Sequence, residues 1–344
     1  MKPYKELTRL GRLRRLRLLA NKALEEYGMT GSKLTFTHYE GNVIFRVDVP
    51  GSSLNKDRSD PYVPNRYNLR ILSTSNAEGI ASELTWLAAL RAEAGIPVPE
   101  PIPTVDGKLL TRIVTPGVPE GKYVSLMRWV DGRRLTVKSM RPLHLKAWGQ
   151  LVGRLHQFAA GWQAPEGFER PVWDWHGQLG EGVLRYPTDE LIASMPPHFQ
   201  EPFKLVSEQT REVMESFGKG PYAYGMIHAD MFLENVLFKK GEPRIIDFED
   251  CGFGYWMFDI GVVLAQWPWT EDFPLVRDSF FDGYSSVRVL PDEQLKHLDL
   301  FMAAQHATMV LWSSAFIRND PGMLEEYEEW RNDEGNKLLR YFDR

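Results

Sequence analysis

The chain has 344 residues, of which 43% are hydrophobic and 25% are charged, and its formal net charge is -5 at pH 7. This length suits about two domains, and the composition is that of a globular protein, which excludes a disordered, collagen-like or coiled-coil chain. The acidic balance argues against nucleic acid as a partner, because proteins that bind it usually carry a basic excess. Cys251 is the only cysteine, so no internal disulfide can form and we expect a reducing, cytoplasmic location.

Residues 1–30 predict a basic amphipathic helix. The segment lacks the apolar run and cleavage site of a signal peptide, so an organelle transit peptide or a membrane-surface helix is the alternative to a packed helix. Apolar side chains recur every three or four residues, at Leu10, Leu13, Leu16, Leu19, Ala23 and Tyr27. We expect this stripe to pack while the arginines stay in water.

Residues 31–130 predict a small β-rich lobe with one helix. Strand-like alternation occurs at Lys33–Tyr39, Asn42–Val49, Arg66–Ser73, Lys108–Val114 and Lys122–Val130. A turn at Glu40-Gly41-Asn42 makes a hairpin of the first two strands, and residues 50–65 read as a loop. Asn76 is a candidate N-cap for a helix that runs to about Ala94.

Residues 131–344 predict a larger helical lobe. Long helical patterns cover Pro142–Trp162, Pro202–Phe217, Pro291–Ile317 and Met323–Phe342. The uncharged stretch from Leu300 to Ile317 contains Gln305 and His306, so we expect a buried helix and no membrane span. The last helix carries a run of glutamates from Glu325 to Glu329, which we expect to be a solvated face, with cation binding as the alternative.

The segment from Tyr224 to Asp250 is the part of the sequence richest in chemistry. His228, Asp230 and Asn235 follow the pattern H-x-D-x-x-x-x-N, and Asp247 comes 12 residues later, after two isoleucines. Phosphoryl transfer needs a carboxylate beside the acceptor hydroxyl and oxygen ligands that hold Mg²⁺ against the phosphates. These residues therefore predict a kinase, with Asp230 as the base and His228 as a scaffold residue that holds the loop.

Two stretches, HADMFLENVLF and IIDFEDCGFGYWMFDIG, resemble the aminoglycoside phosphotransferase and type II homoserine kinase-like family, also called the phosphotransferase enzyme family, of the protein-kinase-like superfamily. The resemblance covers about residues 33–315. It implies an α+β, two-lobe, protein-kinase-like fold with a nucleotide-binding lobe over 31–130 and, over 131–344, the catalytic loop, metal site and acceptor pocket. It further implies that Asp230 is the catalytic base, that Asn235 and Asp247 bind Mg²⁺, and that Asp259 braces the catalytic loop.

The same resemblance assigns the nucleotide site to the small lobe, with ATP, or alternatively GTP, as co-substrate. Its residues would be Gly41 and Asn42 in the hairpin, Arg70 and Glu83 as an ion pair, and Met127, Arg128 and Val130 in the adenine hinge. Arg70 stands where protein kinases carry a lysine, and a planar guanidinium differs from a point ammonium. A plain surface pair of Arg70 and Glu83 is the alternative.

The acceptor is predicted to be a small molecule with a hydroxyl group, similar to an aminoglycoside, homoserine or choline. Protein kinases read H-R-D, D-F-G and A-P-E, whereas this chain has Ala229 in the first motif and Glu249 in the second, and no A-P-E follows. Glu249 and Asp250 would hold an amine of the acceptor or cap their loop. The aromatic stretch from Trp173 to His176 would form a cage for a quaternary ammonium or fill the core.

Two other functions stay open at this stage. One is a protein serine/threonine kinase of the bacterial stress-response type, which the resemblance allows. The other is a nucleotide-binding pseudokinase or regulatory module, although Asp230, Asn235 and Asp247 are all present. The oligomeric state is left undecided.

Overall fold

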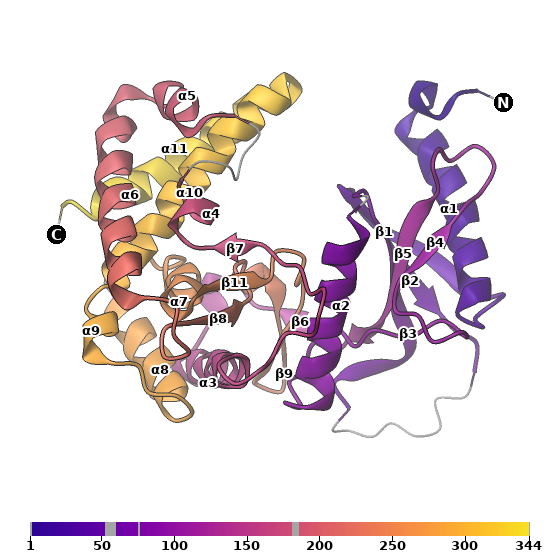
Figure 1. Cartoon of the computed structure of the whole chain (residues 1–344), viewed down its shortest axis with the longest axis horizontal. Helices are drawn as coiled ribbons and strands as arrows, with labels where there is room; N and C mark the ends of the chain where they lie inside the picture. The colour runs from indigo at the N-terminus through magenta and orange to yellow at the C-terminus, as the bar shows by residue number, and fades with distance from the viewer. Residues whose placement is uncertain (1, 52–59, 75, 181–185, 344) are drawn as a thin grey trace. The chain divides into compact units, whose positions relative to one another are not determined.

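The computed structural model describes residues 2–51, 60–74, 76–180 and 186–343, and Figure 1 traces the chain. It separates into two compact units. Unit 1 consists of Met1–Arg133, Ala164–Glu169 and Arg244–Glu249, and unit 2 consists of Arg134–Gln163, Arg170–Pro243 and Asp250–Arg344. The predicted mixed α+β class is confirmed, with an antiparallel sheet in unit 1 and most helices in unit 2.

Five strands of unit 1 form an antiparallel sheet in the order β1-β2-β3-β5-β4. They are β1 (Lys33–Glu40), β2 (Asn42–Asp48), β3 (Tyr62–Ile71), β4 (Thr111–Ile113) and β5 (Lys122–Val130). The predicted hairpin is confirmed, and Gly41 takes φ of 64° at its turn, where glycine carries little strain. β3 begins within the predicted loop because Tyr62 pairs with Val130 on β5. Positions 52–59 of that loop lie outside the described residues, and β4 is shorter than predicted.

Two helices complete unit 1. The first, α1 (Arg9–Glu26), buries Leu16, Leu19, Ala20, Ala23 and Leu24 in the same apolar cluster as the sheet. Leu10 is 60% exposed, so the buried stripe of α1 begins later than the sequence predicts. The second, α2 (Ala77–Ala92), starts after Asn76, whose side-chain oxygen accepts a hydrogen bond from Gly79 N at 3.0 Å, which confirms the predicted N-cap.

The remaining strands are short. They are β6 (Arg133–Arg134), β7 (Val172–Trp173), β8 (Tyr224–Ile227), β9 (Val236–Lys239), β10 (Glu242–Ile245) and β11 (Gly252–Tyr255). In unit 2, β11 lies between β7, to which it is parallel, and β8, to which it is antiparallel. The chain leaves β8 directly into the segment that begins at His228, so this sheet anchors one end of the predicted catalytic loop.

Helices make up most of unit 2. They are α3 (Pro142–Ala159), α4 (Trp175–Gln178), α5 (Thr188–Ala193), α6 (Pro197–Phe217), α7 (Trp256–Leu264), α8 (Phe273–Ser285), α9 (Asp292–Leu295), α10 (Leu298–Asn319) and α11 (Leu324–Arg340). The sequence prediction placed the start of α6 at Pro202, but the helix begins earlier, with Pro197 in its first turn, and carries Pro202 inside. The single helix predicted from Pro291 is two helices, α9 and α10.

Helix α10 packs in the interior of unit 2, against α6, α7 and α11 (Figure 1). It is the one helix, within the described ranges, that is long and apolar enough to cross a membrane, and 78% of its most apolar window is buried inside the protein. The buried helix predicted from Leu300 to Ile317 is therefore confirmed. The glutamates of α11 from Glu325 to Glu329 are exposed, as predicted for a solvated face.

Candidate active site

The segment from His228 to Asn235 is fixed by a buried carboxylate on α7. Asp259 is fully buried and accepts hydrogen bonds from two backbone amides, His228 N at 2.9 Å and Ala229 N at 2.7 Å. Ala229 has φ of 68°, in the left-handed region that a residue with a side chain seldom adopts. The two hydrogen bonds to Asp259 hold this turn. The turn sets the direction of the side chain of the next residue, Asp230.

A buried histidine supports Asp259 in turn. The ring of His156, on α3, contacts Asp259 Oδ2 through Nε2 at 3.1 Å and the hydroxyl of Tyr284 through Nδ1 at 2.9 Å. Burial lowers the pKa of His156, even though the carboxylate of Asp259 acts in the opposite direction. His156 therefore belongs to the scaffold beneath the loop.

Asp230 and Asn235 contact each other within unit 2. The side-chain amide of Asn235 donates to Asp230 Oδ2 at 2.6 Å and to the Asp230 carbonyl at 2.9 Å. His228 Nδ1 accepts from Asp230 N at 3.2 Å, which is the kind of contact expected of a scaffold residue. Because the NH₂ group of Asn235 is engaged in this way, its carbonyl oxygen is the atom that this side chain can offer to a cation.

A pocket of about 570 Å³ opens beside this pair, entirely within unit 2. Its size falls in the range of small-molecule sites. Aromatic rings form much of its wall, at Trp173, Phe232, Phe258, Trp312, Phe316 and Trp330. Its carboxylates are Asp230, Glu234, Asp250 and Glu334. The sequence prediction did not identify the residues from α10 and α11, although Gln305, Thr308, Met309, Trp312 and Phe316 recur at helical spacing.

The four residues from Trp173 to His176 do not form one cage. Trp173 lines the pocket and donates its Nε1 hydrogen to the Asp250 carbonyl at 2.6 Å. Trp175 donates instead to Ser207 Oγ at 2.9 Å and packs against an apolar cluster. Asp174 caps α4 through Gly177 N at 3.2 Å and pairs with Lys219. Of the two interpretations of this stretch, the cage is wrong, because Trp173 is its only member that lines the pocket.

In unit 1, Arg70 on β3 and Glu83 on α2 form a buried ion pair. Their closest atoms are 2.8 Å apart, and their side chains are only 6% and 4% exposed, so the surface-pair alternative is wrong. Burial disfavours the charge of Arg70, but the carboxylates of Glu83, Glu249 and Asp247 outweigh it and raise the pKa of Arg70. Within the described chain, Arg70 Nε has no hydrogen-bond partner, so it is a buried donor that suits a phosphate oxygen.

The hairpin turn in unit 1 contacts the segment after β10. Asn42 donates from Nδ2 to both carboxylate oxygens of Glu249, at 2.7 and 2.8 Å, and its Oδ1 accepts from Ser73 N at 2.9 Å. Glu249 is thus held by Asn42, whereas its neighbour Asp250 lines the pocket of unit 2. Glu249 and Asp250, to which the sequence prediction gave one shared role, therefore lie in different environments.

The predicted adenine hinge is the end of β5. Met127 and Val130 are buried, at 4% and 6% exposure. Arg128 is tied down by its side chain, which pairs with Asp60 at 2.6 Å and stacks over the Tyr62 ring at 4.1 Å. Its backbone amide donates to the Glu100 carbonyl at 2.9 Å. The amide of Arg128 is therefore engaged within unit 1.

The two predicted magnesium ligands lie in different units and are described separately. Asn235 follows the loop in unit 2, and Asp247, in unit 1, follows β10 with an exposed side chain and φ of 66°. Across the residues that the structure describes, no three His, Cys, Asp or Glu side chains gather as a metal cluster. One amide oxygen and one carboxylate are hard ligands that fit Mg²⁺ when phosphate oxygens supply the rest, which is how protein sites usually hold this ion.

Comparison with known proteins identifies the family. Residues 53–294, more than half of the chain, match the phosphotransferase enzyme family, and the chain belongs to it. A homoserine kinase from Methylobacillus glycogenes is 28% identical over 234 residues, which cover 67% of this chain and 66% of that relative. The match thus spans just under two thirds of the relative's own length.

Solved structures confirm the protein-kinase-like fold that the sequence predicts. A microcompartment-associated aminopropanol kinase superposes with a TM-score of 0.74 at 23% identity, covering 95% of this chain and 98% of that one. An amicoumacin kinase, hAmiN, in complex with AMP-PNP, Ca²⁺ and Ami superposes with a TM-score of 0.68 at 21% identity, covering 93% of each chain. At these identities the likeness concerns the fold.

Proposed function

We propose that the protein is a magnesium-dependent kinase that transfers the γ-phosphoryl group of ATP to a hydroxyl of a small, amine-bearing molecule. The observation that carries this proposal is the pocket in unit 2 that has Asp230 and Asn235 in its wall. A pocket of this size suits a small acceptor rather than a segment of a protein. The amicoumacin kinase with AMP-PNP and Ca²⁺ supports a nucleotide and a divalent cation as co-substrate and cofactor.

Asp230 would act as the base. Asn235 donates to Asp230 Oδ2 and so orients the carboxylate that would accept the proton of the acceptor hydroxyl. The hydroxyl oxygen forms a bond to the γ-phosphorus, the bond from that phosphorus to the leaving ADP oxygen breaks, and the proton passes to Asp230. Asn235 and Asp247 would hold Mg²⁺, which supplies positive charge against the phosphates when it is bound.

The charge of the pocket favours an amine without a carboxylate. Four carboxylates line it, at Asp230, Glu234, Asp250 and Glu334, and its described lining includes no lysine or arginine. A cationic amine would be attracted to this wall, whereas the carboxylate of an amino acid would be repelled. We therefore place an amino alcohol or aminoglycoside ahead of homoserine as the acceptor, even though a homoserine kinase is among the relatives.

Asp230→Asn tests the assignment of the base. ADP release would be measured with MgATP and a panel of aminopropanol, homoserine, choline and an aminoglycoside. The wild type should turn over an amine-bearing acceptor, and the variant should lose about 10²- to 10⁴-fold in rate, the usual contribution of a general base. The affinity for MgATP should stay unchanged, because the substitution leaves the nucleotide groups of unit 1 intact.

Three outcomes would contradict the proposal. If Asp230→Asn keeps most of its rate, Asp230 is not the base. If ATP stabilises the wild type against heat but no acceptor is phosphorylated, the protein is a nucleotide-binding module. If labelled phosphate appears on protein serine or threonine and not on the panel, it is a protein kinase.

Asp247→Ala should weaken MgATP binding, and unchanged affinity would remove Asp247 from the metal site.

A further inference from the structure

We propose that Gln305 on α10 and Glu334 on α11 are specificity-determining residues that accept hydrogen bonds from the N–H groups of the acceptor's amine. This inference rests on the proposed function and deepens it. Both residues lie beyond residues 53–294, the part of the chain that matches the family. Acceptor choice would thus be decided by the packing of the last two helices, outside that matched part.

Gln305 offers a buried acceptor atom that is left without a partner. The residue lines the pocket and is only 2% exposed. Among the described residues, none donates a hydrogen bond to its Oε1. A buried carbonyl oxygen without a donor costs free energy, and a ligand that supplies the missing N–H removes that cost. Thr308, one turn along α10, does not supply it, because its hydroxyl donates to the Ala304 carbonyl at 2.9 Å.

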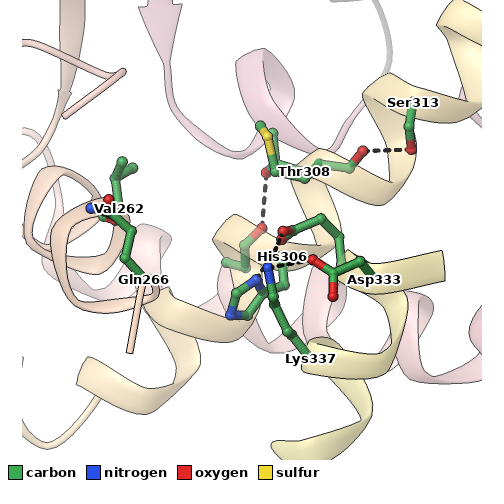
Figure 2. Close-up of polar contacts among 10 residues, drawn as sticks. Val262, Gln266, His306, Thr308, Ser313, Asp333 and Lys337 are labelled. Carbon is green, nitrogen blue, oxygen red and sulfur yellow. Dashed lines mark hydrogen bonds and ion pairs between the residues drawn. The ribbon is translucent and has the colours of Figure 1, made fainter. Parts of the chain in front are cut away.

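Glu334 offers a carboxylate that is held in place from two sides. His306 Nδ1 lies 2.7 Å from Glu334 Oε2, and Lys337 Nζ lies 2.6 Å from Glu334 Oε1. Lys337 also pairs with Asp333 at 2.7 Å, so its positive charge is shared between two carboxylates. Figure 2 shows the side chains of His306, Asp333 and Lys337 gathered in the region where α10 and α11 pack.

Glu334 keeps its negative charge despite being mostly buried. Burial alone would raise the pKa of its carboxyl, but the contacts with His306 and Lys337 outweigh burial and hold that pKa below its ordinary value. Two carboxylates share one lysine in this group, so negative charge remains at the wall of the pocket. His306 and Lys337 are positioning residues, because they orient Glu334 and neither lines the pocket.

The chemistry of these two side chains separates classes of amine. An amide oxygen and a carboxylate accept hydrogen bonds, so a primary ammonium can satisfy both with its N–H groups. A quaternary ammonium has no N–H to give and would leave Gln305 Oε1 without a partner. The aromatic rings of the pocket attract both kinds of cation. Gln305 and Glu334 therefore favour a primary amine over its trimethylated counterpart.

Binding of a matched pair of amines tests this inference without any need for turnover. Aminopropanol and its N-trimethyl derivative would be titrated into the full chain, with ADP and magnesium present, while tryptophan fluorescence is followed. Three tryptophans, Trp173, Trp312 and Trp330, line the pocket and act as reporters. The wild type should bind the primary amine more tightly.

Variants at Gln305 and Glu334 isolate their contributions. Gln305→Leu and Glu334→Gln should each weaken binding of aminopropanol about 10-fold, the usual effect of losing one hydrogen bond to a charged group. Gln305→Leu should change binding of the trimethyl derivative far less, and Gln305→Glu should restore the preference because a carboxylate also accepts. Glu329→Gln, on the exposed part of the same helix as Glu334, is the matched control and should behave as the wild type.

Equal binding of the two amines by the wild type would overturn the inference, as would a Gln305→Leu variant that keeps the full preference. Absence of any fluorescence change with the primary amine, up to its solubility limit, would also overturn it. These results are separate from a failure of the proposed function, in which amines bind as predicted but no acceptor is phosphorylated.

Discussion

Two groups of buried charge, one in each unit, are used in opposite ways. In unit 1, Arg70 and Glu83 are almost fully enclosed and pair with each other, and Arg70 Nε stays without a partner among the described residues. In unit 2, Glu334 is also mostly buried, but it borders a pocket and keeps negative charge beside His306 and Lys337. The first arrangement is a sealed ion pair, whose disruption should destabilise the fold. The second is an ion group left open on one side, whose disruption should mainly change which molecule binds.

The largest effect on stability is expected from opening the sealed pair. Arg70→Met leaves the carboxylate of Glu83 buried without its partner, and the free energy of unfolding should fall by about 3–5 kcal/mol. The double variant Arg70→Met, Glu83→Leu should recover much of this loss, because no unpaired charge remains. Urea unfolding of both variants measures the difference. If Arg70→Met unfolds like the wild type, the pair is not sealed as described.

Asp259 is a fully buried carboxylate in the same unit as Glu334. A substitution at Asp259 therefore tests whether the effect on stability depends on burial or on the unit that holds the charge. Asp259→Asn replaces one accepting oxygen by an NH₂ group that faces a backbone amide of His228 or Ala229. We expect a loss of about 1.5–3 kcal/mol in the free energy of unfolding. Turnover should fall with it while MgATP affinity is kept. A variant that is destabilised but fully active would show that the loop does not need this brace.

The smallest effect on stability is expected at Glu334. Glu334→Gln keeps the size of the side chain and should lower the free energy of unfolding by only about 1 kcal/mol at neutral pH. The folded pKa of Glu334 lies below its ordinary value of 4.5, so its contribution is complete above that pH and is lost as the pH falls further. Acid unfolding curves should therefore be less steep for Glu334→Gln than for Glu329→Gln. Identical curves would contradict the predicted charge of Glu334.

The local features were predicted well because they depend on neighbouring residues. The turn at Gly41 needs a residue that tolerates positive φ, and the cap at Asn76 needs a side chain that reaches the helix amides. The spacing of His228, Asp230 and Asn235 also lies within one short segment. Whether these residues carry the roles that the family resemblance implies stays a prediction, which the variants above test.

An acceptor pocket in the helical lobe was predicted, but most of its lining residues were missed because they come from segments that are far apart in the sequence. The sequence left a cage and core packing open for the stretch from Trp173 to His176, but Trp175 bonds to Ser207 and, of these four residues, only Trp173 lines the pocket. The helix that carries Gln305 was predicted to be buried core. In the last helix, only the glutamates from Glu325 to Glu329 were considered, and Glu334 was not. Side-chain packing decides which face of α10 contacts α11. The spacing of apolar residues along each helix does not by itself fix that choice.

The amino-acid sequence by itself determined the family and the α+β class, and it predicted the residues that would carry the chemistry, because turns, caps and motif spacings act over a few residues. Only the tertiary structure decided that Arg70 and Glu83 are buried together and that Gln305 and Glu334 line one pocket. Such contacts join residues distant along the chain, and they form only where close packing of the whole fold brings their elements together.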